Sequence, residues 1–152
     1  MLSSYQVLAR LLLATILGGL IGFEREARHR AAGLRTHILV CLGSALAMLT
    51  SIYMFEIYRG AATVDPTRIA AQVITGVGFL GAGTILRAGP TVKGLTTAAS
   101  LWAVAGIGLA VGCGFYSGAI ISTILVVVTL VVFSKMETAL SLKGDRKGHT
   151  SP

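Results

Sequence analysis

Four stretches without acidic or basic side chains alternate with short charged segments along the chain. They cover residues 11–23, 36–55, 69–86 and 94–134. The last is about twice as long as one membrane-crossing helix and contains a glycine-rich, turn-like segment, so we divide it into two. The pattern therefore predicts five apolar helices, at about 4–23, 36–57, 67–86, 96–111 and 119–133.

The composition places these helices in a membrane rather than in a soluble domain. Hydrophobic residues make up 54% of the chain, charged residues only 12%, and the mean hydropathy is +0.80. Soluble domains carry roughly 25% charged residues. We therefore expect an all-α, polytopic membrane helix bundle with five transmembrane helices in residues 1–135. The polar segment 136–152 is expected to form a short, disordered cytoplasmic tail.

The distribution of cations predicts the orientation of the bundle. Most Lys and Arg residues lie in the connections 24–35 and 87–93 and in the tail, whereas the opposite connections hold only Arg59 and Arg68. Arg10, within the outer half of the first span, joins them if it snorkels outward. Because cytoplasmic loops carry the excess of positive charge, we expect the N-terminus outside and the C-terminus inside. The net charge of +7 thus indicates membrane orientation and not nucleic-acid binding.

A glycine-rich stretch in the third span fits the dinucleotide-binding pattern G-x-G-x-x-G at residues 76–81. That motif requires an acidic residue about 20 positions later, and no Asp or Glu occurs between residues 66 and 136. Close helix packing is the better interpretation, with an unwound stretch lining a cavity as the alternative. The expected packing residues are Gly76, Gly78, Gly81, Gly83, Gly94 and Thr97.

Polar residues at the span edges form the candidate functional set: Glu24, Arg25, Arg35, Asp65, Arg68 and Gln72. Asp65 precedes Pro66, so it is placed to cap the third helix, and capping alone is the structural alternative to a functional role. Gln72 should hydrogen-bond within the bundle or line a wet cavity. Glu24 either pairs with Arg35 or Arg25 or belongs to a solvated loop. The two Cys and three His have no metal-ligand spacing, so we expect neither a metal nor a cofactor.

Four sequence blocks carry a resemblance to a known family. They are GGLIGFERE at 18–26, AGLRT at 32–36, DPTRIAAQVITGVGFLGAG at 65–83 and VKGLTTAASLW at 92–102. Over residues 8–133 the chain resembles the MgtC/SapB family of bacterial inner-membrane proteins. The resemblance implies a multi-pass protein of the inner (plasma) membrane, linked to growth at low magnesium and, in pathogens, to survival inside macrophages. Longer members carry an ACT-like C-terminal domain, which this short form is expected to lack.

Two functional classes remain open from the sequence. Exposed small-residue faces favour a protein that packs in the lipid bilayer against copies of itself or against other membrane proteins, as part of stress adaptation. The alternative is a small transporter or channel for Mg²⁺, although all the acids lie near or outside the predicted span ends. An enzyme is the least favoured class, because no nucleophile with a partner and no acid–base pair is apparent.

Overall fold

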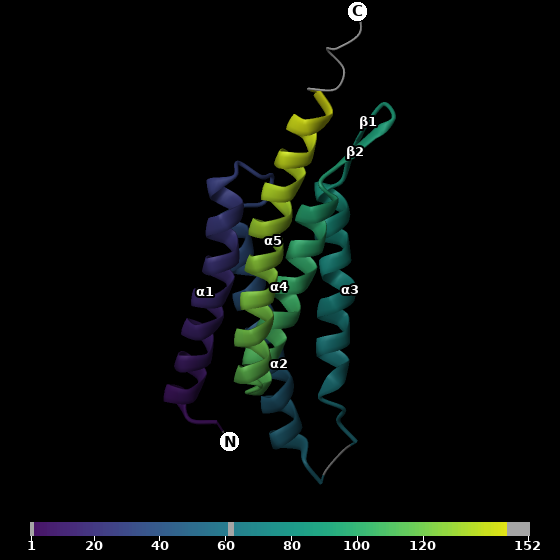
Figure 1. The fold of residues 1–152 in the computed structure, drawn as a ribbon. Helices are drawn as coiled ribbons and strands as arrows, with labels where there is room; N and C mark the ends of the chain where they lie inside the picture. The colour runs from purple at the N-terminus through teal and green to yellow at the C-terminus, as the bar shows by residue number, and fades with distance from the viewer. Residues whose placement is uncertain (1, 61–62, 146–152) are drawn as a thin grey trace, which may run out of the picture.

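The computed structural model describes residues 2–60 and 63–145, and within these ranges it contains five helices and one small hairpin. The helices are α1 (Ser4–Ala27), α2 (Leu34–Tyr58), α3 (Thr67–Thr84), α4 (Leu95–Cys113) and α5 (Tyr116–Asp145). Strands β1 (Leu86–Ala88) and β2 (Thr91–Lys93) pair antiparallel between α3 and α4. The helices lie side by side in up-and-down order, with the start of α1 and the end of α5 at opposite ends of the bundle (Figure 1).

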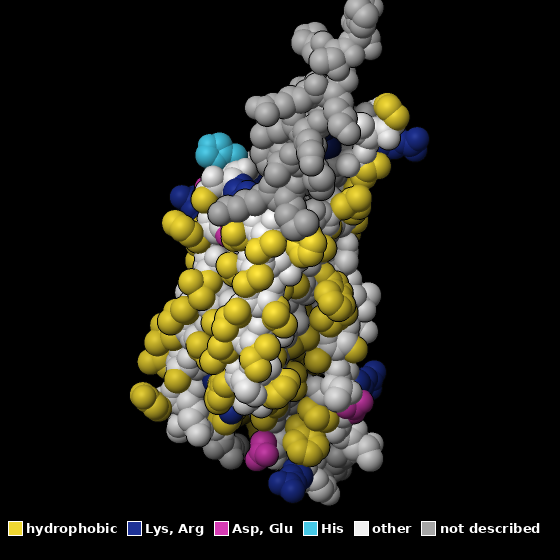
Figure 2. Space-filling model, viewed as in Figure 1, with side chains coloured by type: hydrophobic (Ala, Val, Ile, Leu, Met, Phe, Trp, Pro, Cys, Tyr) yellow, Lys and Arg dark blue, Asp and Glu magenta, His cyan; other side chains and the backbone are white. Residues whose placement is uncertain are grey.

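The described helices have the character of a membrane bundle. Helices α1, α2, α4 and the Tyr116–Ser134 part of α5 are long and apolar enough to cross a membrane. One face of the molecule shows a broad hydrophobic band, with charged side chains gathered mainly toward its two ends (Figure 2). Helix α3 is not among the four, because Arg68, Gln72 and several glycines dilute its apolar content. The predicted all-α fold is thus confirmed, with four helices long and apolar enough to span a membrane.

Two segments differ from the sequence prediction. The third helix ends at Thr84 and not at residue 86, because the chain turns there into the unpredicted hairpin. Gly89, at φ +62°, occupies the first position of its two-residue turn, where hairpins favour glycine. Helix α5 continues through Asp145, although disorder was expected from residue 136. Strong helix formers such as Met, Ala, Leu and Lys in 136–145 explain this extension, and residues 146–152 lie outside the described residues.

Helix α2 lies in close backbone contact with α1 on one side and with α4 on the other. A Cβ added at Gly18 of α1 would lie 2.7 Å from the Cys41 Cβ of α2, and one at Gly22 would lie 2.8 Å from the Leu34 Cα. On the other side, a Cβ at Gly108 of α4 would overlap the Cys41 carbonyl oxygen. Both contacts use glycines four residues apart, the spacing typical of tightly packed membrane helices.

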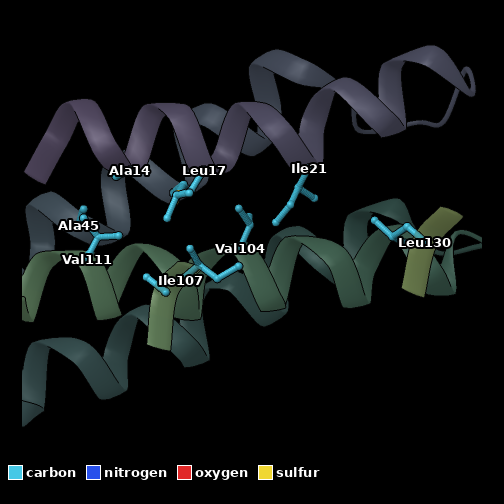
Figure 3. Packing of buried hydrophobic residues seen from close by; sticks show 10 residues of the cluster. Ala14, Leu17, Ile21, Ala45, Val104, Ile107, Val111 and Leu130 are labelled. Atoms are coloured by element: carbon cyan, nitrogen blue, oxygen red, sulfur yellow. The ribbon is translucent and has the colours of Figure 1, made fainter. Parts of the chain in front are cut away.

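An apolar cluster fills the space between α1, α2, α4 and α5. Leu17 and Ile21 of α1 point toward Val104 and Ile107 of α4 (Figure 3). The labelled members of this cluster are Ala14, Leu17, Ile21, Ala45, Val104, Ile107, Val111 and Leu130. A second, smaller cluster joins Val77 of α3 to Leu101 and Ala105 of α4. Helix α3 therefore lies at the edge of the bundle, against α4 and α2.

The packing glycines predicted in the third span play a smaller role within the chain than expected. A Cβ at Gly76, Gly78 or Gly83 would meet nothing within 4 Å, so these residues make no close helix contact in the single chain. Gly81 makes an ordinary contact, 3.4 Å from the Ala98 Cβ. Gly94, at φ +92°, is required by the turn into α4, where a side chain would overlap the Thr84 carbonyl. The sequence signal that identifies the tight contacts is the G-x-x-x-G spacing at 18–22 and 108–112.

Replacing Gly108 with Ala should lower the free energy of unfolding by about 1–3 kcal/mol, because the added methyl overlaps the α2 backbone. The matched control is Gly106→Ala in the same helix, where a Cβ meets nothing within 4 Å. That variant should be neutral, or more stable by up to about 1 kcal/mol, because Ala favours the helix. Reversible unfolding in detergent micelles measures both, and equal effects would contradict the close α2–α4 contact.

A buried polar cluster and the candidate functional site

Buried polar side chains gather where α1 ends and where α2 and α4 begin. Arg25 and Glu24 of α1 are 3% and 9% exposed, and His37 of α2 is fully buried. Thr97 and Ser100, one turn apart in α4, are also buried. We call these five residues the buried polar cluster. Because three helix ends meet here, the cluster couples the first hairpin of the bundle to α4.

Arg25 lies at the centre of the cluster. Its Nη2 donates a hydrogen bond to the Thr97 hydroxyl at 3.1 Å, and its Nη1 lies 3.8 Å from a Glu24 carboxylate oxygen. The Arg25 Nε has no hydrogen-bond partner. Glu24 makes its closer ion pair with Arg28, whose Nε lies 2.5 Å from Glu24 Oε1, and Arg28 also donates to the Ser134 hydroxyl of α5. The end of α1 is therefore tied to both α4 and α5.

His37 links the start of α2 to α4. Its Nδ1 lies 2.9 Å from the Gly33 carbonyl oxygen and its Nε2 lies 3.0 Å from the Ser100 hydroxyl. Because a carbonyl oxygen only accepts, Nδ1 is the donor in the first contact. The Ser100 hydroxyl also lies 2.8 Å from the Thr97 carbonyl, so its proton has two acceptors within reach. A histidine with both ring nitrogens engaged is fixed in orientation.

The other predicted residues at this end take different positions. Arg35 is exposed, lines a cavity of about 510 Å³ between α2 and α3, and does not pair with Glu24. Of the two partners predicted for Glu24, Arg25 is found at 3.8 Å and Arg35 is not, because Glu24 faces Arg28 along its own helix. Glu26 instead accepts the Leu34 backbone N–H at 3.0 Å. That bond caps α2, whose Gly33 start has no side chain to do so.

The start of α3, which carries Asp65, Arg68 and Gln72, lies at the opposite end of the bundle from the end of α1 and the starts of α2 and α4 (Figure 1). Asp65 Oδ1 accepts bonds from the Thr67 backbone N–H at 2.8 Å and from the Thr67 hydroxyl at 2.7 Å, so the predicted cap is confirmed. These two bonds lower the pKa of the Asp65 carboxyl. Arg68 and Gln72 are exposed on α3, and neither side chain hydrogen-bonds within the described residues. The bond predicted for Gln72 is not made inside the chain.

Several contacts were missed by sequence reasoning. Arg10 does not simply snorkel: its Nη1 donates to the Gly112 carbonyl at 2.7 Å and its Nε to the Tyr116 hydroxyl at 3.0 Å, tying α1 to the α4–α5 corner. His37 and Ser100 were not in the predicted set, and Thr97 was assigned to packing alone. Isolated polar residues inside apolar runs were the available signal, since such groups need partners in a membrane.

The side chains of the buried polar cluster favour binding of anions over binding of divalent cations. No group of three His, Cys, Asp or Glu that could hold a metal ion occurs in the part of the chain that the structure describes. Glu24, the buried carboxylate, is already neutralised by Arg28. The remaining groups of the cluster are a guanidinium, an imidazole and hydroxyls, which donate hydrogen bonds more readily than they ligate Mg²⁺.

Replacing Thr97 with Val removes the acceptor of the buried Arg25 bond while keeping the shape of the side chain. We expect a loss of about 1.5–3 kcal/mol in unfolding free energy, the usual worth of a hydrogen bond to a charged group. Thr96→Val is the matched control, because the neighbouring Thr96 is exposed and should change stability by less than about 0.5 kcal/mol. Unfolding in detergent micelles gives both values, and an unchanged unfolding free energy in the Thr97 variant would show that the Arg25–Thr97 bond does not stabilise the fold.

The Asp65 cap should make stability depend on pH. The folded carboxyl has a lowered pKa, so its contribution is complete above the ordinary Asp pKa of about 3.9 and is lost as pH falls through the folded value. Asp65→Asn keeps an acceptor for the Thr67 N–H but cannot ionise. The difference in melting temperature between wild type and this variant should therefore shrink from pH 6 to pH 2. A difference that stays constant over this range would contradict the assignment.

Known proteins resemble this chain in sequence over most of its length. The model of the MgtC family matches residues 11–139. The putative magnesium transporter YhiD of Escherichia coli K12 is 45% identical over 140 residues, which cover 91% of this chain and 65% of the relative. Protein MgtC of Brucella abortus strain 2308 is 42% identical over 139 residues, which cover 91% of this chain and 56% of the relative.

A third relative, protein MgtC of Salmonella typhimurium, is 39% identical over 148 residues, covering 94% of this chain and 61% of the relative. The chain thus spans about 56–65% of the length of these curated relatives. No solved structure matches it. The family match covers most of the chain, including the buried polar cluster and α3, and so this chain belongs to the MgtC family.

Proposed function

We propose that this protein resides in the bacterial inner membrane and supports growth when magnesium is scarce, without catalysing a reaction. Its action depends on association with a second copy of itself through α3. In a pathogen, the same role would support survival inside host cells. The magnesium link is supported by the family and by the name of the E. coli relative. The association is supported by the exposed face of α3.

We propose that all five helices cross the membrane, with the N-terminus outside and the C-terminus in the cytoplasm. Support comes from the up-and-down order of the helices and from the opposite positions of the start of α1 and the end of α5 (Figure 1). The α1–α2 connection and the hairpin, which carry Arg28, Arg30, Arg87 and Lys93, lie at the end assigned to the cytoplasm. In this arrangement α3 is exposed to the bilayer along its outer face.

The outer face of α3 carries groups that lipid does not satisfy. Arg68, Gln72 and Thr75 follow one another at helical spacing and are all exposed, and Phe79 is 84% exposed on the same stripe. Gly83 continues the stripe and has open space beside it. A polar amide facing hydrocarbon costs free energy unless it is paired. A partner helix that approaches the small residues closely would supply both packing and hydrogen bonds.

A second copy fits this face best, because two copies with the same membrane orientation place identical α3 faces together. Around a two-fold axis along the membrane normal, the Gln72 amides of the two copies meet, and an amide both donates and accepts hydrogen bonds. Arg68 and Asp65 lie one turn apart at the same end of α3, so each Arg68 can approach the carboxylate of the other copy. The face is therefore self-complementary in charge and hydrogen bonding.

Transport of Mg²⁺ is the second candidate, and the name of the E. coli relative favours it. The described part of the bundle provides few suitable ligands for this ion. Mg²⁺ prefers several oxygen ligands, usually including carboxylates. The buried carboxylate, Glu24, is engaged by Arg28, and the buried Arg25 beside it repels a divalent cation. We therefore rank association above conduction.

Disulfide cross-linking in liposomes tests the association. Cys41 is fully buried, so Cys113→Ser leaves a background without an exposed native thiol. In that background Thr75→Cys, on the outer face of α3, should form a cross-linked dimer that persists as lipid is added. The matched control is Ile16→Cys, an exposed apolar position on α1, which should stay monomeric. Equal cross-linking at both positions would reject the α3 interface.

Two further measurements separate the candidate functions. Gly83→Leu should fold, because a side chain there has space within the chain, yet it should block association and fail to restore growth at low magnesium. Liposomes holding the wild-type protein and a trapped Mg²⁺ indicator should take up no more Mg²⁺ than protein-free liposomes. Uptake above that level, with normal growth of the Gly83 variant, would support transport instead.

A further inference from the structure

A second polar feature lies beside the buried polar cluster and belongs to neither candidate function. A cavity of about 750 Å³ opens between the end of α1, the hairpin, the start of α4 and the later part of α5. Its charged lining residues are Arg25, Arg30 and Lys93, which come from three different segments of the chain. Hydroxyl groups of Thr96, Thr97, Thr129 and Ser134 complete its polar wall.

The cavity is electropositive because the nearby carboxylates are engaged elsewhere. None of its described lining residues is Asp or Glu. Glu24 lies 2.5 Å from Arg28 but 3.8 Å from Arg25 Nη1. It therefore neutralises the charge of Arg25 only in part. Glu26 caps the start of α2 through the Leu34 N–H. Three cations therefore face the cavity with less than one compensating negative charge.

The start of α4 adds backbone donors to the same wall. Residues 94–97 line the cavity, at the start of this 19-residue helix. The first amides of a helix have no intrahelical acceptor, and no side chain caps the start of α4. Gly94, at φ +92°, brings the chain from the hairpin directly into this turn. Helix N-termini attract anions through these amides and through the helix dipole.

The state of Arg25 independently indicates a ligand. This side chain is only 3% exposed and lines the cavity. Its Nη2 donates a hydrogen bond to the Thr97 hydroxyl, but its Nε donor has no hydrogen-bond partner. A buried guanidinium donor left unpaired costs free energy. An oxyanion in the cavity would lie beside the Arg25 guanidinium, between the α4 amides and the side chains of Arg30 and Lys93.

We propose that this cavity binds a phosphate group. A tetrahedral oxyanion with several acceptor oxygens matches a guanidinium, a helix N-terminus, an ammonium and hydroxyls converging from different sides. The apolar lining residues Val92, Leu95, Leu130 and Phe133 lie beside this polar wall, at the end of the membrane-spanning helices. The phosphate can thus belong to an anionic lipid headgroup or to a free phosphate, and the proposal does not rest on self-association.

The test measures the melting temperature of the purified full chain in phosphate-free detergent micelles. One arm titrates inorganic phosphate, and the other adds bicelles of phosphatidylglycerol, with phosphatidylcholine bicelles as the neutral reference. We expect saturable stabilisation in at least one arm. A response to inorganic phosphate identifies a free-phosphate site, and a response to phosphatidylglycerol alone identifies a lipid headgroup site. No stabilisation in either arm overturns the proposal.

A charge-matched pair of double variants distinguishes the cavity from general charge. Arg30→Gln with Lys93→Gln removes two cavity cations, both on exposed residues, and should weaken the apparent affinity about tenfold or more. Arg35→Gln with Arg87→Gln removes two exposed cations at the same end that do not line the cavity, and should change it by less than about twofold. Equal losses in both overturn the proposal. If the first double variant does not fold, Lys93→Gln alone on the hairpin gives the same comparison.

Discussion

The structure depends on the close contact that α2 makes with α1 and α4. Lipid tails are as apolar as leucine, so burial of apolar surface does not hold membrane helices together, and close van der Waals packing must do so. The backbone of α1 approaches α2 at Gly18 and Gly22, and the backbone of α4 approaches α2 at Gly108 and Gly112. A Cβ at any of these positions would collide with α2. Cys41 of α2 faces both neighbours, because its Cβ lies beside Gly18 of α1 and its carbonyl oxygen lies beside Gly108 of α4.

The same contact determines where the polar chemistry lies. With α1 and α4 held against α2, the end of α1 meets the starts of α2 and α4, and Arg25, His37 and Thr97 become buried together. Burying a guanidinium is tolerated because Thr97 and Glu24 offset part of its desolvation. Arg25, whose Nε donor remains unpaired, also lines a cavity whose wall holds Arg30, Lys93 and the start of α4. A structural cluster and a candidate anion site are therefore two sides of one arrangement.

Helix α3 stands apart from this packed centre. It contacts α4 through Val77, Leu101 and Ala105, and within the α3 helix only Gly81 approaches α4, at an ordinary contact distance. Its Gly76 and Gly83 leave open space, and its polar groups face outward. Glycines thus have two roles in one chain: those at 18–22 and 108–112 close the bundle, whereas those of α3 leave a surface free for another helix. This difference is what favours association as the mode of action.

The sequence by itself determined the helices, the membrane environment, the family and the Asp65 cap. These features follow from local properties: the lengths of uncharged runs, a conspicuous set of ordered motifs, and a carboxylate two residues before the amide that it caps. Only the tertiary structure decided which glycines pack, that Glu24 faces Arg28 and not Arg35, and that His37 reaches Ser100 across two helices. Those pairings depend on how each helix is rotated about its axis and on which helices are neighbours. A run of apolar residues specifies a helix, but its rotation and its neighbours are set by the packing of the whole bundle.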